Sequence, residues 1–396
     1  MKRRLSFLLF PLVGTACAGI HFSPFIASFS LGLTLLLSLF FIKDSLIKRN
    51  WWIWLLPMLF VWQMAAQLLL GWQSGIDAKI LLKLPLLFFP LLVTWSMNTD
   101  AQKHKLQVLT GMNLFQFWIA AASVLNYLTD FEFYNQMILE SKPIPIFSQV
   151  YHIEFSMMLS VFALAGIFEK RIQGHFISQM LFWLSMANIA LVFFISVRTG
   201  MLCVMSGAAL KWLFDLRQNK SAVWFLPGMF ILVVLAFLLV PALKNRLNNT
   251  IDDVKTIVQG GDVRDKSLGR RWVAWDAALR ASVHAPLTGF GIKGVEDAIN
   301  TGYEEQAYKI EKSERVMPHN QFLDLILQSG WATLILLILF FAGGLFYLTK
   351  MKSSAGLAVW AALITAAFFE SYFERQAGIL LFTCAWLMLF KPEKTE

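Results

Sequence analysis

The stretch QSGWATLILLILFFAGGLFYLT, residues 328–349, contains no Asp, Glu, Lys or Arg. A helix that crosses the hydrocarbon core of a bilayer needs about 20 mostly apolar residues. This stretch therefore predicts a transmembrane helix. Two lysines, Lys350 and Lys352, follow it directly. Short connectors rich in Lys and Arg stay on the cytoplasmic side of a membrane, so we expect this end of the helix to face the cytoplasm.

Similar apolar stretches recur along the whole chain. We expect spans near residues 5–20, 23–42, 51–71, 80–97, 106–127, 154–168, 176–196, 199–215, 222–243, 328–349, 355–370 and 376–390. The predicted fold class is therefore an all-α polytopic membrane protein with about 12 transmembrane helices. The N-terminal Met1-Lys2-Arg3-Arg4 and the apolar run after it resemble a signal peptide, but Pro11 within the run favours an uncleaved first span.

The composition agrees with a membrane protein. Hydrophobic residues make up 57% of the chain and charged residues 15%, and the mean hydropathy is +0.60. A soluble domain has about half apolar and a quarter charged residues. The formal charge of +9 is spread between apolar segments, so membrane topology explains it and we expect no nucleic-acid partner. Cys17, Cys203 and Cys384 each lie in an apolar run and predict packing residues.

The basic residues of the connectors predict the orientation. Connectors on one side carry Lys43, Lys48, Arg49, Lys103, Lys105, Lys170, Arg171, Lys211, Arg217, Lys220, Lys350, Lys352, Lys391 and Lys394. Connectors on the other side carry Lys79, Lys83, Lys142, Arg198 and Arg375. We therefore expect both termini in the cytoplasm. Residues 1–243 would hold spans one to nine, residues 244–327 a large external loop, and residues 328–396 the last three spans with a cytoplasmic tail.

The large loop concentrates the polar residues that are candidates for chemistry. Arg271 lies one turn before Trp275, so both side chains can share a helix face, with the ring at the interface and the guanidinium toward an anion such as phosphate. The turn at residues 286–291 contains Pro and paired Gly, which end a helix and allow close backbone approach. Residues 317–320, MPHN, then lead into an apolar helix closed by Gly330.

Two further residues stand out by position. Arg198 lies at the outer end of the seventh predicted span, where a charge at membrane depth costs about 2.5–3.5 kcal/mol and is usually functional or paired. His319 combines an external location, a preceding proline and a following membrane helix. Histidine titrates near neutrality and can accept a proton from a hydroxyl nucleophile. These residues predict an outward-facing site with anion-binding arginines and one possible base.

Each candidate also has a structural interpretation. Arg198 can extend its guanidinium to the interface, and Arg271 can be a solvated loop residue. His319 can enter a helix by hydrogen bonding the backbone. His152 lies at the outer mouth of the sixth span and indicates a structural or substrate-positioning role. We interpret Lys83 first as a charge that sets the membrane topology, and second as a contact to phosphate.

Three motifs in this order resemble the O-antigen ligase and polymerase superfamily. They are Ser196-x-Arg198-Thr199, then Arg271-x-x-x-Trp275-x-x-Ala278-Leu279 leading into Pro286-Leu287-x-Gly289-x-Gly291, and then His319-Asn320-x-x-Leu323 followed by Gly330. The similarity is clearest from about residue 190 to 350. It implies a GT-C-type membrane glycosyltransferase of the bacterial inner membrane. Such an enzyme passes a glycan from undecaprenyl diphosphate to a sugar hydroxyl, such as one on lipid A-core, at the periplasmic face, without a cofactor or a metal.

The resemblance also implies residue roles. Arg198 and Arg271 would neutralise the diphosphate, whose negative charge grows in the transition state, with the adjacent Arg270 as the alternative phosphate contact. His319 would be the general base, worth about 10²- to 10⁴-fold in rate, and a single displacement would invert the anomeric configuration. The further candidate substrate-binding residues are Lys83, His152 and Asn320.

Other functions remain open at the level of sequence. Within the superfamily, a Wzy-type polymerase that joins repeat units and a protein O-oligosaccharyltransferase are alternatives, and the sequence offers no discriminator among acceptors. A lipid-linked oligosaccharide flippase or secondary transporter would predict internal repeats and polar residues at mid-bilayer with broken helices. The polar residues here collect at outer helix ends and in one loop, which disfavours transport.

Overall fold

The computed structural model describes residues 2–41, 50–71, 76–96, 102–140, 142–169, 176–216, 228, 231, 234, 237, 238, 240–264, 266–306 and 310–389. Within these ranges the regular structure is helical and contains no strand. The all-α prediction is thus confirmed for the described residues.

The helices of the first half are α1 (Lys2–Gly19), α2 (Pro24–Ser38), α4 (Leu55–Leu69), α5 (Ile76–Leu82), α6 (Leu84–Leu87), α7 (Phe89–Ser96), α8 (Gln102–Thr129), α9 (Phe131–Leu139), α10 (His152–Phe168), α11 (Phe176–Ile195) and α12 (Arg198–Leu216). Those of the second half are α14 (Pro241–Val258), α15 (Ser267–Val283), α16 (Gly291–Glu304), α17 (Gln321–Ser329), α18 (Trp331–Lys350), α19 (Ser354–Phe369) and α20 (Gln376–Leu389). Short 3₁₀ turns are η1 (Leu39–Phe41), η2 (Trp51–Trp54), η5 (Lys312–Glu314) and η6 (Tyr372–Glu374).

Many of these helices are apolar enough for a bilayer. Those long enough to cross a membrane are Trp51–Leu69, Lys105–Thr129, Phe176–Ile195 and Trp331–Lys350. Shorter apolar helices are Leu8–Gly19, Pro24–Ser38, His152–Phe168, Ser354–Phe369 and Gln376–Trp386. These features agree with a multi-pass membrane protein, and the total of about 12 spans stays a prediction.

Two of the expected spans need separate comment. The span expected at residues 80–97 is divided among α5, α6 and α7. Pro85 and Pro90 lie in this stretch, and proline removes a helical hydrogen bond and clashes with the preceding turn. The span expected at residues 222–243 falls largely outside the described residues.

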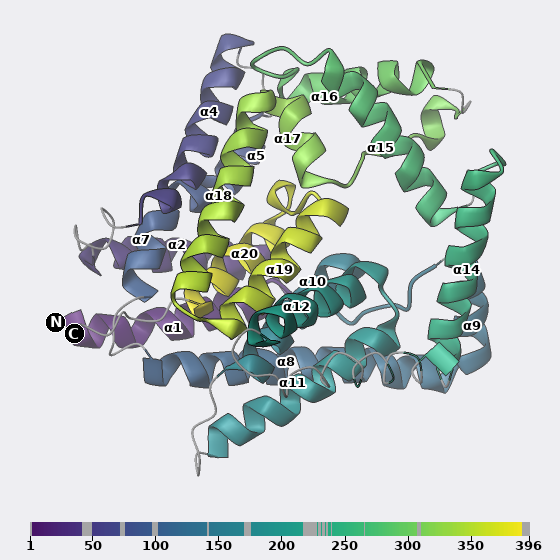
Figure 1. Cartoon of the computed structure of the whole chain (residues 1–396). Helices are drawn as coiled ribbons and strands as arrows, with labels where there is room; N and C mark the ends of the chain where they lie inside the picture. Colours follow the sequence, from purple (N-terminus) through teal and green to yellow (C-terminus); the bar gives the residue numbers. More distant parts are fainter. Residues whose placement is uncertain are drawn as a thin grey trace.

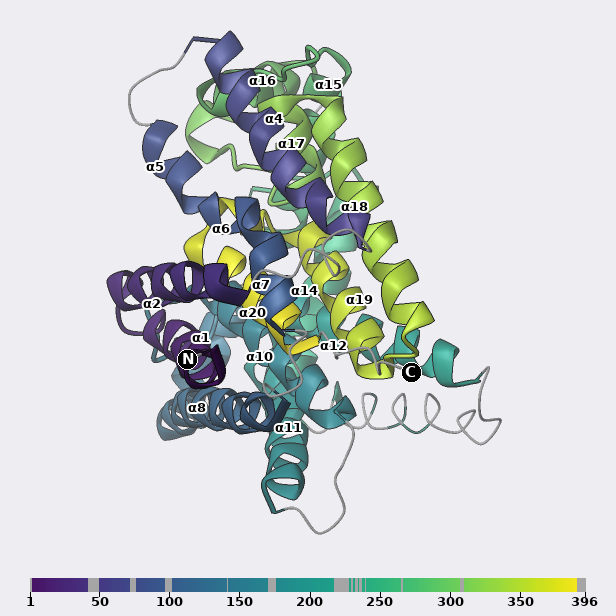
Figure 2. The same cartoon turned by 90° about the vertical axis from the view of Figure 1, so that its left-hand side faces the viewer.

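The helices pack in layers around α10, α12 and α19 (Figures 1 and 2). Helix α12 lies along α19, and α10 packs against both. Helix α11 packs against both α8 and α10, while α18 lies along α4. In Figure 1, α14 and α9 form one edge of the molecule, and α15 and α16 extend from α14 toward α4.

An aromatic cluster anchors α19 and α20. The indole rings of Trp360 and Trp386 lie edge to face with centroids 4.3 Å apart, and Phe340 of α18 contacts both rings. Trp52 approaches Trp386 to 5.2 Å. Such ring pairs stabilise beyond the area that they bury, by about 0.5–1.5 kcal/mol each. This cluster fixes two helices whose connector, residues 370–375, reaches the site described below.

Residues expected as the large external loop form a helical unit of their own. Helices α15, α16 and α17 enclose a second hydrophobic core, separate from that of the main bundle. Ala277 and Ala278 of α15 are fully buried in this core, together with Leu327 of α17. Small alanine side chains let the neighbouring helix approach closely. The external location of this unit stays a prediction.

The turn at residues 286–291 packs directly on the end of α17. Gly289 and Gly330 both have positive φ, at 68° and 82°, a region that side chains rarely tolerate. A Cβ on Gly289 would collide with the backbone of Ser329, and one on Gly330 with the carbonyl of Leu287. Glycine is therefore required twice where these two segments meet.

Candidate functional site

A cavity of about 140 Å³ lies where α10, α12, α14, α15 and the end of α19 meet. It is lined by Pro143, His152, Ile153, Ser196, Val197, Arg198, Thr199, Leu202, Arg246, Ser267, Leu268, Arg271 and Phe369. The lining includes three arginines and no carboxylate. Its composition therefore favours an anionic ligand.

Three helix N-termini converge on this cavity. Helix α10 begins at His152, α12 at Arg198 and α15 at Ser267, and all three residues line it. The first backbone N–H groups of a helix lack intrahelical partners, and the helix dipole places positive charge at this end. Ser196, with φ of 57°, turns the chain between α11 and α12 so that α12 starts here. The helix N-termini and the arginines thus both favour a negatively charged ligand.

Arg198 is only partly satisfied by the protein. Its Nη1 lies 3.5 Å from Oδ2 of the buried Asp253, which also accepts a hydrogen bond from the Leu268 N–H at 2.9 Å. The Nε and Nη2 atoms of Arg198 are buried and have no hydrogen-bond partner among the described residues. A buried guanidinium normally satisfies its donors, so these two donors require an acceptor that the described residues do not supply.

Arg246 of α14 is the third arginine of the cavity, and the sequence did not point to it. Its Nη2 donates to the carbonyl of Lys142 at 3.0 Å. Burial first, and then the charge of Arg198, lower the pKa of Arg246 to about 10, while Asp253 opposes the shift. Positive charges are thus crowded here, and an anion would relieve their repulsion.

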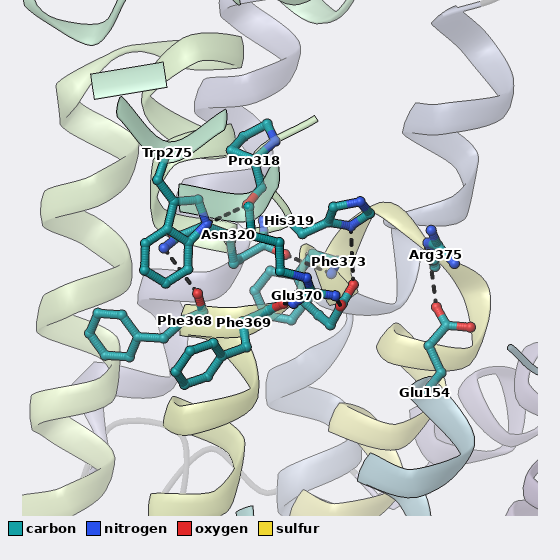
Figure 3. A network of polar contacts seen from close by, with 12 residues as sticks. Glu154, Trp275, Pro318, His319, Asn320, Phe368, Phe369, Glu370, Phe373 and Arg375 are labelled. Carbon is teal, nitrogen blue, oxygen red and sulfur yellow. Dashed lines mark hydrogen bonds and ion pairs between the residues drawn. The ribbon is translucent and has the colours of Figure 1, made fainter. Parts of the chain in front are cut away.

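Arg271 connects the cavity to His319 through the carboxylate of Glu370, whose contact with His319 is drawn in Figure 3. Its Nη1 donates to the Phe369 carbonyl at 2.8 Å, and its Nη2 lies 2.7 Å from Oε1 of Glu370. The other oxygen of Glu370 lies 3.3 Å from Nδ1 of His319.

The backbone around His319 is held on both sides (Figure 3). Trp275 donates its indole N–H to the Pro318 carbonyl at 2.5 Å. The Asn320 side chain caps α17 by accepting from the N–H groups of Phe322 and Leu323, and it donates to the Phe368 carbonyl at 3.0 Å. His319 itself has φ of 46°, a region that non-glycine residues adopt rarely. Such strain persists only where the surroundings enforce it.

The remaining sequence candidates lie elsewhere. Arg270 donates to the carbonyl of Glu314 at 3.1 Å and is absent from the cavity lining. Lys83 is buried, with its ammonium 2.5 Å from Glu374 and 3.2 Å from the amide oxygen of Gln328. Neither residue lines the cavity. Their substrate-binding roles stay predictions without support from this geometry.

The structure brings Arg198, Arg271 and His152 into one cavity and places His319 beside it through Glu370. Sequence reasoning missed Glu370, Asp253 and Arg246. Glu370 had a usable signal, because it is a carboxylate at the end of an expected span, where charges are usually paired or functional. Among the described residues, no group of three or more His, Cys, Asp or Glu side chains is placed to hold a metal ion.

Comparison with known proteins adds one match. Residues 181–338 match the protein family described as O-antigen ligase. This segment contains Arg198, Arg246, Arg271 and His319. No curated protein matches the chain.

Proposed function

We propose a specific transfer reaction for this protein, supported by the match of residues 181–338 to the O-antigen ligase family, which suggests a ligase or a related polymerase. It moves a glycan from undecaprenyl diphosphate to a sugar hydroxyl of an acceptor such as lipid A-core. The reaction takes place at the periplasmic face of the bacterial inner membrane, with both termini in the cytoplasm. The architecture would be that of a GT-C-type glycosyltransferase.

The observation that carries this proposal is the arginine-lined cavity next to His319. A diphosphate presents several oxygens that accept hydrogen bonds, and Arg198 offers two buried donors that lack partners among the described residues. Arg271 and Arg246 line the same cavity, as do the first residues of three helices. Helix N-termini and arginines together are a frequent way of binding phosphate groups.

The proposed chemistry is a single displacement. The acceptor hydroxyl oxygen forms a bond to the anomeric carbon as the bond from that carbon to the diphosphate oxygen breaks. The electron pair of the broken bond leaves with undecaprenyl diphosphate, where Arg198 and Arg271 stabilise the growing negative charge. The hydroxyl proton passes to His319. Attack opposite the leaving group inverts the anomeric configuration.

The two sides of the site would serve different substrates. The His319 side chain is 31% exposed and lies outside the cavity lining, so its ring is reachable by an acceptor, whereas Arg198 and Arg271, 23% and 21% exposed, line the cavity. His152, at the start of α10, lines the cavity and would position the donor. Asn320 would act indirectly, because its amide caps α17 and binds the α19 backbone.

A test in the host separates ligase from polymerase. The gene is deleted and complemented with wild type or His319→Ala, and surface glycolipid and undecaprenyl-linked glycan are both analysed. Full-length chains accumulating on undecaprenyl diphosphate, with bare lipid A-core, support a ligase. Accumulated single repeat units indicate a polymerase, and loss of glycan from proteins alone indicates a protein O-oligosaccharyltransferase. An unchanged glycan profile refutes the proposal and favours the alternative of a flippase or secondary transporter.

A test with purified protein addresses the residues. His319→Ala should abolish transfer from a defined undecaprenyl-diphosphate glycan in a protein that still inserts and elutes as wild type. Arg280→Ala is the matched control, because Arg280 lies on α15 with Arg271 but is 44% exposed and pairs with Asp276. Wild-type transfer by a well-inserted His319→Ala protein would rule out the base assignment.

A further inference from the structure

We propose that Glu370 is a positioning residue for the transfer reaction: it orients the His319 ring with Nε2 as the base nitrogen and aligns Arg271 with the diphosphate. This inference rests on the proposed function, since it assigns His319 as the base and Arg271 as a diphosphate ligand. Glu370 belongs to none of the motifs by which the family resemblance was identified.

The geometry places one carboxylate between the two groups. Oε1 of Glu370 lies 2.7 Å from Nη2 of Arg271, and Oε2 lies 3.3 Å from Nδ1 of His319. The Glu370 side chain is only 5% exposed, so water screens the two electrostatic contacts only weakly. A shift of this carboxylate would displace the candidate base and the candidate diphosphate ligand together.

The contact between Glu370 and His319 also determines which nitrogen of the imidazole ring is unprotonated and carries the free lone pair. An ionised carboxylate only accepts hydrogen bonds, so the neutral imidazole donates from Nδ1–H to Glu370 and leaves Nε2 unprotonated. Figure 3 shows Nδ1 as the ring nitrogen turned to Glu370, at 3.3 Å from Oε2. When Nε2 accepts the hydroxyl proton, the carboxylate stabilises the imidazolium that forms.

The connector that carries Glu370 is fixed at several points. Glu374 binds Lys83 at 2.5 Å, and Arg375 lies 3.6 Å from Glu154 of α10. The Phe373 N–H donates to Oε1 of Gln321, at the start of α17, at 2.7 Å. The connector is therefore tied to the element that follows His319. Its backbone sets the position of the Glu370 carboxylate before substrate binds.

Other charged groups surround Glu370 and His319 and contribute to any pH dependence of the transfer rate. On α10, His152 and Glu154 act on Glu370 electrostatically. Asp324 of α17 acts on His319, and Arg375 of the connector acts on Glu154. None of these makes the direct contact with His319 that Glu370 makes. A substitution at Glu370 should therefore change the behaviour of His319 most directly.

The test compares three full-length variants in one transfer assay over a range of pH. Glu370→Gln keeps the side-chain shape but removes the charge, and we expect turnover at pH 7 to fall about 10- to 100-fold. The acid limb of its pH–rate profile should move to lower pH by about one unit, because the imidazolium loses its carboxylate. Glu370→Asp keeps the charge and should recover part of the rate and the wild-type position of the limb.

Arg280→Ala is the control, because Arg280 is 44% exposed, pairs with Asp276 of its own helix and contacts neither His319 nor the connector. It should leave the position of the acid limb unchanged. If Glu370→Gln does not insert, the Glu370→Asp profile decides. An acid limb that moves although the carboxylate charge is kept would overturn the positioning role. A Glu370→Gln protein with wild-type turnover, or with reduced turnover and an unmoved limb, overturns the positioning role.

The outcome for His319→Ala separates this inference from the proposed function. An inactive His319→Ala protein beside a fully normal Glu370→Gln protein refutes the positioning role alone. A fully active His319→Ala protein refutes the base assignment on which the inference rests.

Discussion

Trp275 and Pro318 are joined by a hydrogen bond of 2.5 Å from the indole Nε1 to the proline carbonyl. The bond links α15, which carries Arg271 one turn earlier, to the residue before His319. The Trp275 ring also packs against Phe369, with centroids 5.9 Å apart. One tryptophan thus fixes the distance between the arginine and histidine sides of the site.

Substitution of this tryptophan should slow transfer without weakening donor binding. Trp275→Phe keeps an aromatic ring against Phe369 but leaves the Pro318 carbonyl without its donor. A lost hydrogen bond of about 0.5–1.5 kcal/mol predicts a turnover about 2- to 15-fold lower, with the KM for the lipid donor unchanged. Steady-state kinetics on purified protein measure both. A raised KM with normal turnover would contradict this account.

Removal of the Arg198 side chain should weaken donor binding. Arg198→Ala removes two buried donors from the cavity and leaves Asp253 without its cation. Hydrogen bonds to charged groups contribute about 1.5–3 kcal/mol, which predicts a KM for the lipid diphosphate about 10- to 100-fold higher. Inorganic pyrophosphate should raise the melting temperature of wild type and of Arg280→Ala, but not of Arg198→Ala. Equal stabilisation of all three proteins would exclude the cavity as the diphosphate site.

Substitutions of Asn320 should separate its two structural roles, the cap of α17 and the hydrogen bond to α19. Asn320→Ala removes both the α17 cap and the bond to the Phe368 carbonyl, and we expect it to lower stability by about 1–2 kcal/mol. Asn320→Asp keeps the capping oxygen but loses the donor to Phe368, so it should lose less. Thermal unfolding in detergent, followed by tryptophan fluorescence, ranks the variants. Equal losses for the two variants would mean that the bond to the Phe368 carbonyl of α19 dominates.

Asp324 should make folding stability depend on pH. Burial raises the pKa of Asp324 to about 7, and the charge of Glu374 acts in the same direction. The folded state therefore binds this proton more tightly than the unfolded state, whose carboxyl titrates near pH 3.9. The stability from this group is fully present below about pH 4 and is lost as pH rises toward 7.

Asp324→Asn should remove that dependence, because the amide stays neutral at every pH. Relative to wild type, the variant should gain stability between pH 5 and pH 8, by an amount on the order of 1–4 kcal/mol. Melting temperatures of both proteins across this range give the difference directly. A difference that stays constant with pH would mean that Asp324 is ionised throughout.

The sequence alone determined the helical, apolar character of the chain and most helix positions. Runs such as residues 328–349 and 176–196 have too few polar groups to fold otherwise, since a helix satisfies its own backbone in an apolar medium. It also indicated a helix carrying Arg271 and Trp275 and a glycine-dependent turn before α17. These are local properties, set by periodicity, proline and glycine.

Only the tertiary structure decided which polar residues meet. Arg246, Asp253 and Glu370 are separated along the chain from the residues that they contact, and no local pattern records such a contact. Arg198 and Asp253 come together because α12 begins at the cavity that α14 also lines, and Glu370 reaches His319 because the aromatic cluster anchors α19. The same packing places Lys83 in an ion pair with Glu374. Partners of this kind depend on long-range packing, which determines charge pairing in a buried site.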